Sequence, residues 1–277
     1  MNSSTPSSAD LKELVSFACN LADIAAAVSM QYFRQLPSVD NKLNDGQFDP
    51  VTIADREAEL QMRAAIEKHY PAHGVFGEEF GPKASDVNLT WVLDPIDGTR
   101  AFISGIPVWG TLIALFDGTQ PILGVMDQPF IGERFVASGD TSAYLHNNKE
   151  TVLTTRDCDS LKNAIMMSTA PDMFTDDEFQ VQQQLAEQAK LLRYGADCYA
   201  YCMLASGHID LVVEAGLSPY DIQALIPIVH NAGGMVTDWG GGSAVNGGQV
   251  VAAGTPALHA QALELLAPSA KKSETIL

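Results

Sequence analysis

The sequence predicts a mixed α/β (α+β) fold made of two parts, residues 1–160 and 161–277. In the first part, two amphipathic helix patterns precede a series of short strand patterns separated by turn residues, which is typical of an antiparallel sheet. In the second part, strand and helix patterns alternate, which indicates a mixed sheet. With 277 residues, of which 46% are hydrophobic and 18% charged, the chain is large enough and apolar enough for a sizeable core.

Two helices and a polar segment are expected before the first strand. Apolar residues recur at helical spacing in the first helix, which Ser8 or Asp10 caps and which runs to about Gln35. A second helix begins with Thr52 as its N-terminal cap. Between them, residues 38–51 are polar and contain Gly and Pro, so that they form either a lid over a site or a plain surface loop.

The remaining elements follow from short apolar runs and turn signals. In the first part, strands are expected at residues 75–76, 91–93, 109–116, 121–127, 133–137 and 144–146. In the second part, strands are expected at residues 166–169, 191–193, 209–214, 235–237 and 250–253, and helices at residues 175–189, 196–206, 219–232 and 256–266. The Gly-rich residues 240–248 precede no helix pattern and contain no Lys-Ser/Thr pair, so they form a hairpin loop rather than a phosphate cradle.

The charge balance restricts the classes of ligand. The 16 Lys and Arg residues stand against 34 Asp and Glu residues, which gives a formal net charge of −18. Binding to a nucleic-acid backbone needs clustered cations, so we expect no nucleic-acid partner. A small anionic substrate is compatible with this charge, provided that metal ions supply positive charge locally.

The N-terminus and the cysteines are those expected of a protein in a reducing compartment. The first residues, MNSSTPSSAD, contain no apolar leader segment, and no uninterrupted apolar run of 18 residues occurs, so we expect no membrane partner and a cytoplasmic location. The four cysteines show no CxxC spacing. Cys198 and Cys202 lie four residues apart on an expected helix and are either zinc ligands or, as we favour, small buried hydrophobic residues.

Residues 91–105, WVLDPIDGTRAFISG, combine an abrupt strand end with two carboxylates. Asp94 follows the apolar run WVL directly, and Asp97 follows three residues later. Because a strand end fixes the direction of its side chains, both carboxylates can converge on one point, with the Ile96 carbonyl between them. A second acidic motif, GEEFG, contributes Glu78 at the end of the preceding strand.

These oxygen ligands predict a Mg²⁺ site, and three carboxylates suit two ions, a usual arrangement for in-line displacement at phosphorus. Gly98 permits close approach of the backbone to a phosphate, and the amides of Gly98 and Thr99 open a helix whose N-terminus favours an anion. Thr99 also offers a hydroxyl to orient an attacking water. Taken alone, DPIDG is equally an Asx-type turn and GEE a solvated bend, whereas the two together, each after an apolar strand, favour the metal site.

Four motifs share their order and spacing with one enzyme family. They are DPVTIAD (residues 49–55), GEEFG (77–81), WVLDPIDGTRAFISG (91–105) and PYDI (219–222), and they resemble the motifs of the inositol-monophosphatase superfamily of Mg²⁺-dependent phosphatases. The resemblance covers the chain from about residue 11 to residue 267. It implies a layered α-β-α-β-α sandwich with an antiparallel sheet in the N-terminal half and a mixed sheet in the C-terminal half. RAFISG, WGT, DQP and RYGADCY are similar to the histidinol-phosphatase branch.

The resemblance implies a role for each matching residue. The implied ligands of two or three Mg²⁺ ions are Glu78, Asp94, the Ile96 carbonyl, Asp97 and Asp221. Asp55 and Thr99 match the groups that, together with Glu78, position the nucleophilic water. The implied reaction is hydrolysis of a phosphate monoester by direct attack of a metal-activated water, without a phosphoenzyme. Judged by its sequence context alone, Asp221 would be only a helix cap.

The resemblance also implies a set of substrate contacts: Gly98, Thr99, Arg100, Arg193, Asp197 and Glu214. Histidinol phosphate carries an amine and an imidazole, so its pocket is expected to contain acids, which points to Asp197 and Glu214. Asp197 also sits where it could simply cap a helix. Arg193 either senses phosphate, reaches across a dimer interface or is an ordinary strand-end cation.

Three functions are therefore weighed. The first is Mg²⁺-dependent hydrolysis of L-histidinol phosphate to L-histidinol, a step of histidine biosynthesis. The second is an inositol monophosphatase or a broad sugar-phosphate phosphatase of the same fold, against which Asp197 and Arg100 argue. The third is a regulatory or RNA-associated partner without catalysis, against which the intact acid set and the net charge of −18 argue. The expected partners are a small phosphorylated substrate and, from the resemblance, a second copy of the chain in a homodimer.

Overall fold

Helices and strands follow one another in nearly the order that the sequence predicts. The computed structural model describes residues 7–35 and 52–271, so the expected lid or loop at 38–51 and the Thr52 side chain lie outside the described part. The helices within it are α1 (Ser8–Tyr32), α2 (Thr52–His69), α3 (Thr99–Ile103), α4 (Asp176–Gln188), α5 (Asp197–Ala205), α6 (Pro219–Ile222), α7 (Leu225–Asn231) and α8 (Pro256–Leu266), with 3₁₀ turns η1 (Leu161–Asn163), η2 (Pro171–Met173) and η3 (Ala267–Ser269).

The strands form two sheets. The seven-stranded sheet follows chain order: β1 (Gly74–Gly77), β2 (Thr90–Asp97), β3 (Gly110–Phe116), β4 (Pro121–Gln128), β5 (Glu133–Ser138), β6 (Thr141–His146) and β7 (Lys149–Val152). Its first pair, β1 and β2, is parallel, and all later pairs are antiparallel. The five-stranded sheet has the order β11-β12-β10-β8-β9. It comprises β8 (Ile165–Ser168), β9 (Leu191–Tyr194), β10 (Leu211–Leu217), β11 (Met235–Asp238) and β12 (Gly248–Ala253), and it mixes parallel with antiparallel pairs.

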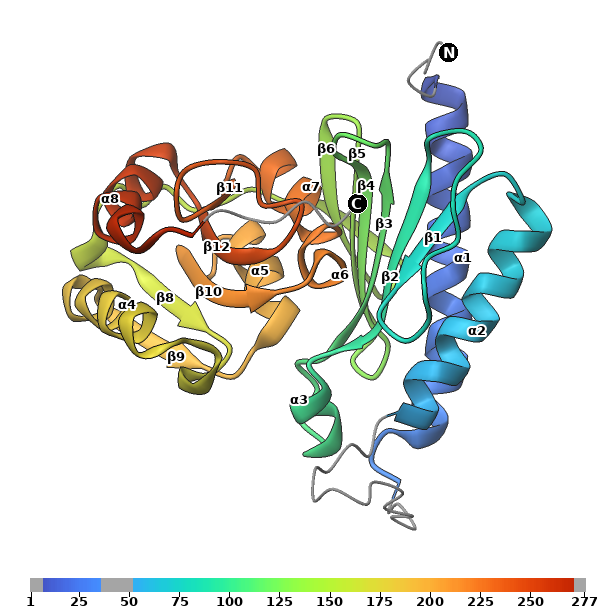
Figure 1. Cartoon of the computed structure of the whole chain (residues 1–277), viewed down its shortest axis with the longest axis horizontal. Coiled ribbons are helices and arrows are strands. Elements are labelled where there is room, and N and C mark those ends of the chain that lie inside the picture. The colour runs from blue at the N-terminus through green and yellow to red at the C-terminus, as the bar shows by residue number, and fades with distance from the viewer. Residues whose placement is uncertain (1–6, 36–51, 272–277) are drawn as a thin grey trace.

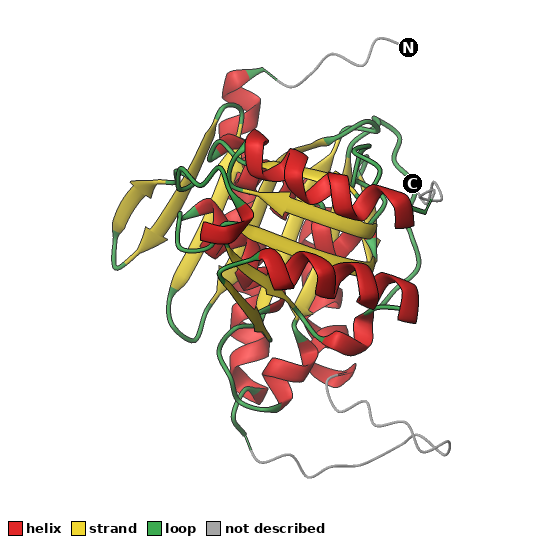
Figure 2. Ribbon diagram, turned by 90° about the vertical axis from the view of Figure 1, so that its left-hand side faces the viewer, coloured by secondary structure: helices red, strands yellow, loops and turns green. Residues whose placement is uncertain are grey.

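Five layers result (Figure 1). Helices α1 and α2 cover the outer face of the seven-stranded sheet, and α5, α6 and α7 lie between the two sheets. Helices α4 and α8 cover the outer face of the five-stranded sheet, as the view from that side shows (Figure 2). The predicted layered α-β-α-β-α sandwich is confirmed, with a mixed sheet in the second half and a sheet in the first half that is antiparallel except for the pair β1–β2.

The N-cap of helix α1 lies one position before Ser8 and three positions before Asp10, the two predicted caps. Its N-cap is Ser7, whose amide and hydroxyl donate to the Asp10 carboxylate at 3.0 and 2.6 Å in a capping box. Residues Ala9–Tyr32 are long and apolar enough to cross a membrane, with a mean hydropathy of 1.4. One face of this helix, with Ala18 and Leu21 fully buried, packs into the core beneath β3 and β4, and this packing accounts for its apolar composition.

The strand through the central motif does not stop at Asp94 as predicted but continues to Asp97. Asp94 pairs with Leu112 of β3 and Asp97 pairs with Gly110, so Pro95 and Ile96 together oppose one residue, and the register shifts there. This is a β-bulge, a place where a strand tolerates proline because the missing amide breaks no ladder bond. The bulge turns both carboxylates toward the end of the sheet while the backbone stays anchored to β3.

Two further elements differ from the prediction. The helix expected over residues 219–232 is interrupted between α6 and α7, because Pro227 has no amide to donate to the Gln223 carbonyl and its ring would crowd that carbonyl. Strand β7 has no signal in the sequence, since three of its residues KETV are polar and all four are exposed. The turn before it has Asn147 and Asn148 at φ of 52° and 60°, which suits a tight hairpin.

Gly124 of β4 marks the closest approach of the seven-stranded sheet to the central helices. A Cβ at this position would lie 2.0 Å from the carbonyl oxygen of Ala224. We expect Gly124→Ala to lower the free energy of unfolding by about 1–3 kcal/mol, measured by urea denaturation, because backbone must move to make room. Gly81→Ala is the control, since a Cβ there has no neighbour within 4 Å. Equal stability of the two variants would show that the interface yields freely.

Candidate active site

Two strand ends bring the acidic motifs together. Strands β1 and β2 are parallel, with Gly77 opposite Leu93, so the two strands end at the same edge of the sheet. The Glu78 amide donates to the Leu93 carbonyl at 3.3 Å, which places Glu78 beside Asp94. The carboxylates of GEEFG and DPID therefore meet although 16 residues separate them in sequence.

Five carboxylates form two overlapping groups that share Asp94. Oxygens of Asp55, Glu78 and Asp94 lie within 4.8 Å of one another, and so do oxygens of Asp94, Asp97 and Asp221. Asp55 and Asp94 are buried, Asp97 and Asp221 are half-buried, and Glu78 is exposed. The structure thus assembles all five side chains that the sequence analysis assigned as metal ligands or as catalytic acids.

Hydrogen bonds in the bulge fix the direction of Asp94. Its Oδ1 accepts the Ile96 amide at 3.0 Å, and the Pro95 carbonyl accepts the Thr111 hydroxyl at 2.8 Å. The Thr99 hydroxyl donates to the Ile96 carbonyl at 3.4 Å, so these two predicted groups are in contact. The Ile96 side chain is fully buried against Phe102 and Trp109. Helix α3 has only five residues, and its dipole is correspondingly weak support for an anion.

Asp221 caps a helix and also lies in the second acid group. Its carboxylate accepts the Ser218 amide at 2.7 Å as part of the capping box of α6, and one of its oxygens belongs to the second acid group. Because a carboxylate has about four acceptor positions, capping leaves capacity for a cation. The cap also fixes the rotamer of Asp221, so the helix end orients a ligand at no additional cost in side-chain entropy.

The N-terminus of α5 lies against Asp97 of the second acid group. The Cys198 amide donates to Asp97 at 2.8 Å, and Asp197 has a left-handed φ of 45°. Gly98, at φ 82°, leaves room for Asp197: a Cβ on Gly98 would lie 3.1 Å from the Asp197 Cβ. Gly98 is therefore required both by its backbone conformation and by this contact.

Burial and mutual repulsion raise the pKa values of these acids. Burial, followed by the charges of Glu78 and Asp97, holds the pKa of Asp94 well above its usual range. Burial and the Asp197 charge do the same to the pKa of Asp97. Burial raises the pKa of Asp221 to about 7 and that of Asp197 to about 6. In the described residues, no ion pair to Lys, Arg or His neutralises Asp94, Asp97 or Asp221.

This donor set fits hard divalent cations. All donors are oxygens, they form two groups of the size of one coordination sphere, and their repulsion is relieved only by positive charge. Two groups sharing one carboxylate are also what a pair of ions needs. The chemistry of the residues present therefore agrees with the predicted Mg²⁺ cofactor.

Three of the predicted substrate contacts, Arg100, Glu214 and Arg193, lie in different environments. Arg100 is exposed and pairs with Asp172 of η2, with 2.9 Å between Nη2 and Oδ2, across the two halves of the chain. Glu214 is buried and already accepts three bonds, from the amide and hydroxyl of Thr169 and from the Tyr201 hydroxyl. Burial raises the pKa of Glu214 to about 7. Arg193 is exposed near the end of β9, and its side chain forms no hydrogen bond or ion pair within the described part of the chain, so its roles remain predictions.

Sequence reasoning missed the residues that hold Glu214 and Arg100 in place. Thr169 and Tyr201 hold Glu214, and Asp172 holds Arg100. Tyr201 lies four residues after Asp197, one turn along α5, and this spacing was the only available signal. Thr169 and Asp172 contact partners 45 and 72 residues away, a relation that no local pattern contains.

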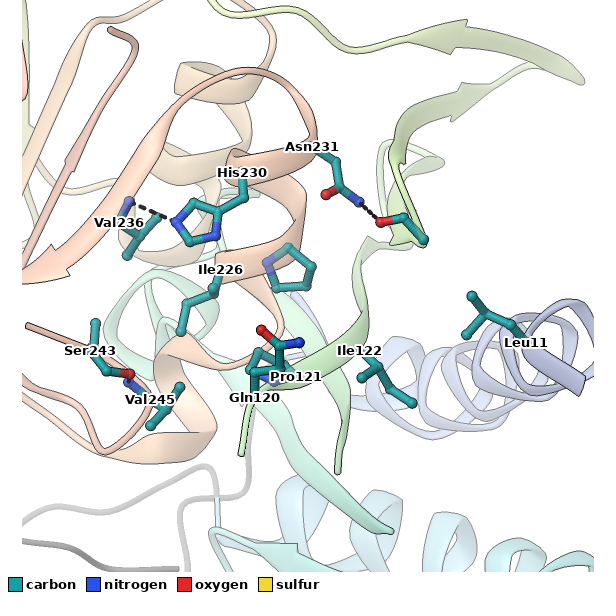
Figure 3. Close-up of a pocket in the computed structure, with 13 residues that line it drawn as sticks. Leu11, Gln120, Pro121, Ile122, Ile226, His230, Asn231, Val236, Ser243 and Val245 are labelled. Atoms are coloured by element: carbon teal, nitrogen blue, oxygen red, sulfur yellow. Dashed lines mark hydrogen bonds between the residues drawn. The ribbon is translucent and has the colours of Figure 1, made fainter. Parts of the chain in front are cut away.

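A cavity of about 480 Å³ lies elsewhere, where α1, β4, α7 and the β11–β12 loop meet (Figure 3). Ile122, Ile226 and Val245 line it with His230 and Asn231, and none of its lining residues is a carboxylate. His230 accepts the Val236 amide at 3.1 Å. The cavity therefore belongs to the packing between the layers rather than to the acid site.

Comparison with known proteins agrees with this site. Residues 10–274 match the inositol monophosphatase family. The chain is 41% identical to the bifunctional phosphatase IMPL2, chloroplastic, of Arabidopsis thaliana, over 96% of this chain and 79% of that protein. It is 35% identical to a histidinol-phosphatase of Chlorobaculum parvum, over 84% of this chain and 88% of that one. A solved inositol monophosphatase from Zymomonas mobilis superposes with a TM-score of 0.83 at 39% identity, over 94% of this chain and 99% of that one.

Fold and site are those of a family of phosphatases whose members act on small phosphorylated substrates. The match covers almost the whole chain, and the chain belongs to the inositol monophosphatase family.

The raised pKa values predict that the metal-free protein loses stability as pH rises and that Mg²⁺ stabilises it more at higher pH. The folded-state pKa of Asp221, about 7, lies above its ordinary value of 3.8, so its contribution to stability is present at low pH and lost as pH rises through about 7. The Tm of the metal-free protein should therefore fall from about pH 5 to about pH 8, and added Mg²⁺ should raise Tm more at the higher pH. Calorimetry measures both, with Asp221→Asn as the variant in which the dependence flattens. An equal Mg²⁺ effect at both pH values would contradict the assignment.

Proposed function

We propose that the protein is a Mg²⁺-dependent phosphoric monoester hydrolase whose substrate is L-histidinol phosphate, which it converts to L-histidinol in histidine biosynthesis. The proposed reaction type rests on one observation. Two clusters of three carboxylates each, with Asp94 in both, lie at the ends of β1 and β2. Membership of the inositol monophosphatase family supports the same reaction. The experiment that tests it is an assay of purified protein with Mg²⁺ and a panel of phosphate monoesters, compared by kcat/KM.

The chain would hold two or three ions through the carboxylates of the two acid groups, which the fold places close together. Glu78 and Asp94 would serve the first group, with Asp94, Asp97 and Asp221 serving the second. When bound, Mg²⁺ supplies Lewis-acid stabilisation of the phosphate ester and of its leaving oxygen and lowers the pKa of a nearby water. The carboxylates supply the fixed negative charge and the geometry for this chemistry.

Orientation of the attacking water would fall to Asp55, Glu78 and Thr99. Asp55 is buried within the first acid group and can accept a proton from water held there. Thr99 opens α3 at the end of the same strand, with its hydroxyl beside the Ile96 carbonyl. Since the water is aimed by side chains on rigid elements, displacement at phosphorus needs no covalent intermediate.

The choice of histidinol phosphate rests on acids near the phosphate position. Asp197 is half-buried beside Gly98 and Asp97 and is the acid best placed to face an amine or imidazole of a bound substrate. Glu214, the second acid, is held by Thr169 and Tyr201 and lies close enough to Asp197 for the charge of Asp197 to raise its pKa. The relative from Chlorobaculum parvum is named a histidinol-phosphatase, which supports the same substrate.

One observation favours a second candidate, an inositol monophosphatase activity. The solved structure with 39% identity is described as an inositol monophosphatase. A polyol hydroxyl can donate a hydrogen bond to the carboxylate at position 197 but brings no positive charge to it, so we propose inositol phosphate as the slower substrate. We also propose the homodimer that the motif resemblance implies, which light scattering of the purified protein tests.

Asp94 belongs to both acid groups, so its loss should affect metal binding and hydrolysis together. We expect Asp94→Asn to lower kcat/KM by about 1,000-fold, equivalent to about 4 kcal/mol of transition-state stabilisation, in an assay of phosphate release. Excess EDTA should abolish the activity of the wild type. Glu67→Gln is the control, since Glu67 is an exposed residue paired with Lys83. Phosphate release by Asp94→Asn at the wild-type rate would identify a contaminant as the source.

Asp197 is predicted to discriminate between substrates. A charged hydrogen bond to the substrate amine or imidazole is worth about 1.5–3 kcal/mol, so Asp197→Asn should lower kcat/KM for histidinol phosphate by about 10- to 100-fold. The value for inositol 1-phosphate should change by less than about threefold, because no cation faces the residue. The ratio of the two constants is the measurement, and it cancels losses common to both substrates. An unchanged ratio would remove Asp197 from the specificity pocket.

A further inference from the structure

The GEEFG loop is anchored to helix α2 by a buried ion pair. Glu59 of α2 is 0% exposed and accepts the Glu79 amide at 2.8 Å. Arg63, one turn further along, donates its Nε to Glu59 at 2.7 Å and its Nη2 to the Phe80 carbonyl at 2.9 Å. The two residues that follow Glu78 are thereby fixed to the helix through their backbone.

Gly77 makes this anchor possible. A Cβ on Gly77 would lie 2.2 Å from Oε1 and 2.6 Å from Oε2 of Glu59, so only glycine leaves space for the carboxylate against the end of β1. The backbone of Gly77 is in an ordinary strand conformation, since it is not among the residues with positive φ. The requirement for glycine at this position is therefore steric and comes from Glu59.

Helix α2 also supplies a residue of the acid site. Asp55 and Glu59 are four residues apart, which places them about 6 Å apart along one face of the helix. Asp55 lies in the first acid group with Glu78, and Glu59 binds the residue next to Glu78. The same rigid helix thus determines both where Asp55 lies and where the loop bearing Glu78 lies.

We infer that Glu59 is a positioning residue, which holds Glu78 in register with Asp55 and Asp94 and so sets the affinity of the site for divalent cations. This inference rests on the proposed metal-dependent function, and it adds residues that the acid cluster itself does not contain. Groups that orient metal ligands are typically worth about 10- to 100-fold in metal affinity. A purely structural role of the Glu59–Arg63 pair would instead lower stability and leave the affinity of the folded protein unchanged.

The first experiment compares two glycines of the same loop. Mn²⁺ binding is measured by calorimetry without substrate, at a temperature where circular dichroism shows each variant to be folded. In Gly77→Ala the new methyl group displaces Glu59, and we expect the dissociation constant for Mn²⁺ to rise about tenfold or more. Gly81→Ala is the matched control, because a Cβ there has no neighbour within 4 Å, and its affinity should stay within about twofold of the wild type.

The second experiment removes the charge of Glu59 while it keeps the size of the side chain. Glu59→Gln keeps the shape of the side chain but removes the charge that binds Arg63, and we expect the same weakening of Mn²⁺ binding. Glu67→Gln, on the exposed side of the same helix, should bind Mn²⁺ as the wild type does. In a Glu78→Gln background, Glu59→Gln should have no further effect, because it acts through Glu78.

These results distinguish the inference from its alternatives. Wild-type Mn²⁺ affinity in Gly77→Ala and Glu59→Gln, equal losses in the two controls, or additive effects with Glu78→Gln would each overturn it. Failure of both variants to fold would assign Glu59 to stability alone and would overturn it as well. Because binding is read without substrate, a wild type that binds Mn²⁺ but does not hydrolyse histidinol phosphate would refute the proposed substrate while the role of Glu59 is still decided by the variants.

Discussion

Repulsion among carboxylates gathered at one end of a sheet is the constraint on which this site depends. Asp55, Asp94, Asp97 and Asp221 would separate in a flexible chain, and burial makes their joint ionisation costly. The fold opposes this separation with backbone hydrogen bonds: the bulge in β2 is fixed to Thr111 of β3, and the α6 cap fixes Asp221. The cluster is thereby preorganised for cations, whose binding relieves the repulsion that folding imposes.

The layers explain why the acids come from four distant segments. Strands β1 and β2 contribute their ends, α2 lies over the outer face of that sheet, and α5 and α6 approach from between the sheets. Three layers, namely α1 with α2, the seven-stranded sheet and the helices between the sheets, therefore supply the carboxylates, and a shift of any one of these layers changes the distances between them. The close contact of Gly124 with Ala224 and that of Gly77 with Glu59 keep two of these layers in register.

Predictions from the sequence were most accurate where they depend on residues that are neighbours along the chain. Short apolar runs bounded by turn residues located most strands. The motifs DPIDG and GEEFG pointed to Asp94, Asp97 and Glu78, because acids that follow two neighbouring buried strands favour a cation site over plain turns. The same local rules failed at the bulge, where the proline predicts an end to β2 that the strand does not have, and at Pro227, whose effect on the helix falls four residues earlier at Gln223. They failed at β7 because an exposed edge strand need not alternate.

The sequence by itself determined the mixed α/β fold class and the family resemblance, and it predicted the acid set, because these depend on residue types and on spacing along the chain. Only the tertiary structure decided that Asp94 joins two acid groups, that Asp221 both caps α6 and faces the site, and that Glu214 is occupied by Thr169 and Tyr201. Only the tertiary structure showed that the Glu59 carboxylate packs against Gly77. These relations join residues far apart in sequence, and their contact distances follow from the packing of whole layers rather than from any local preference.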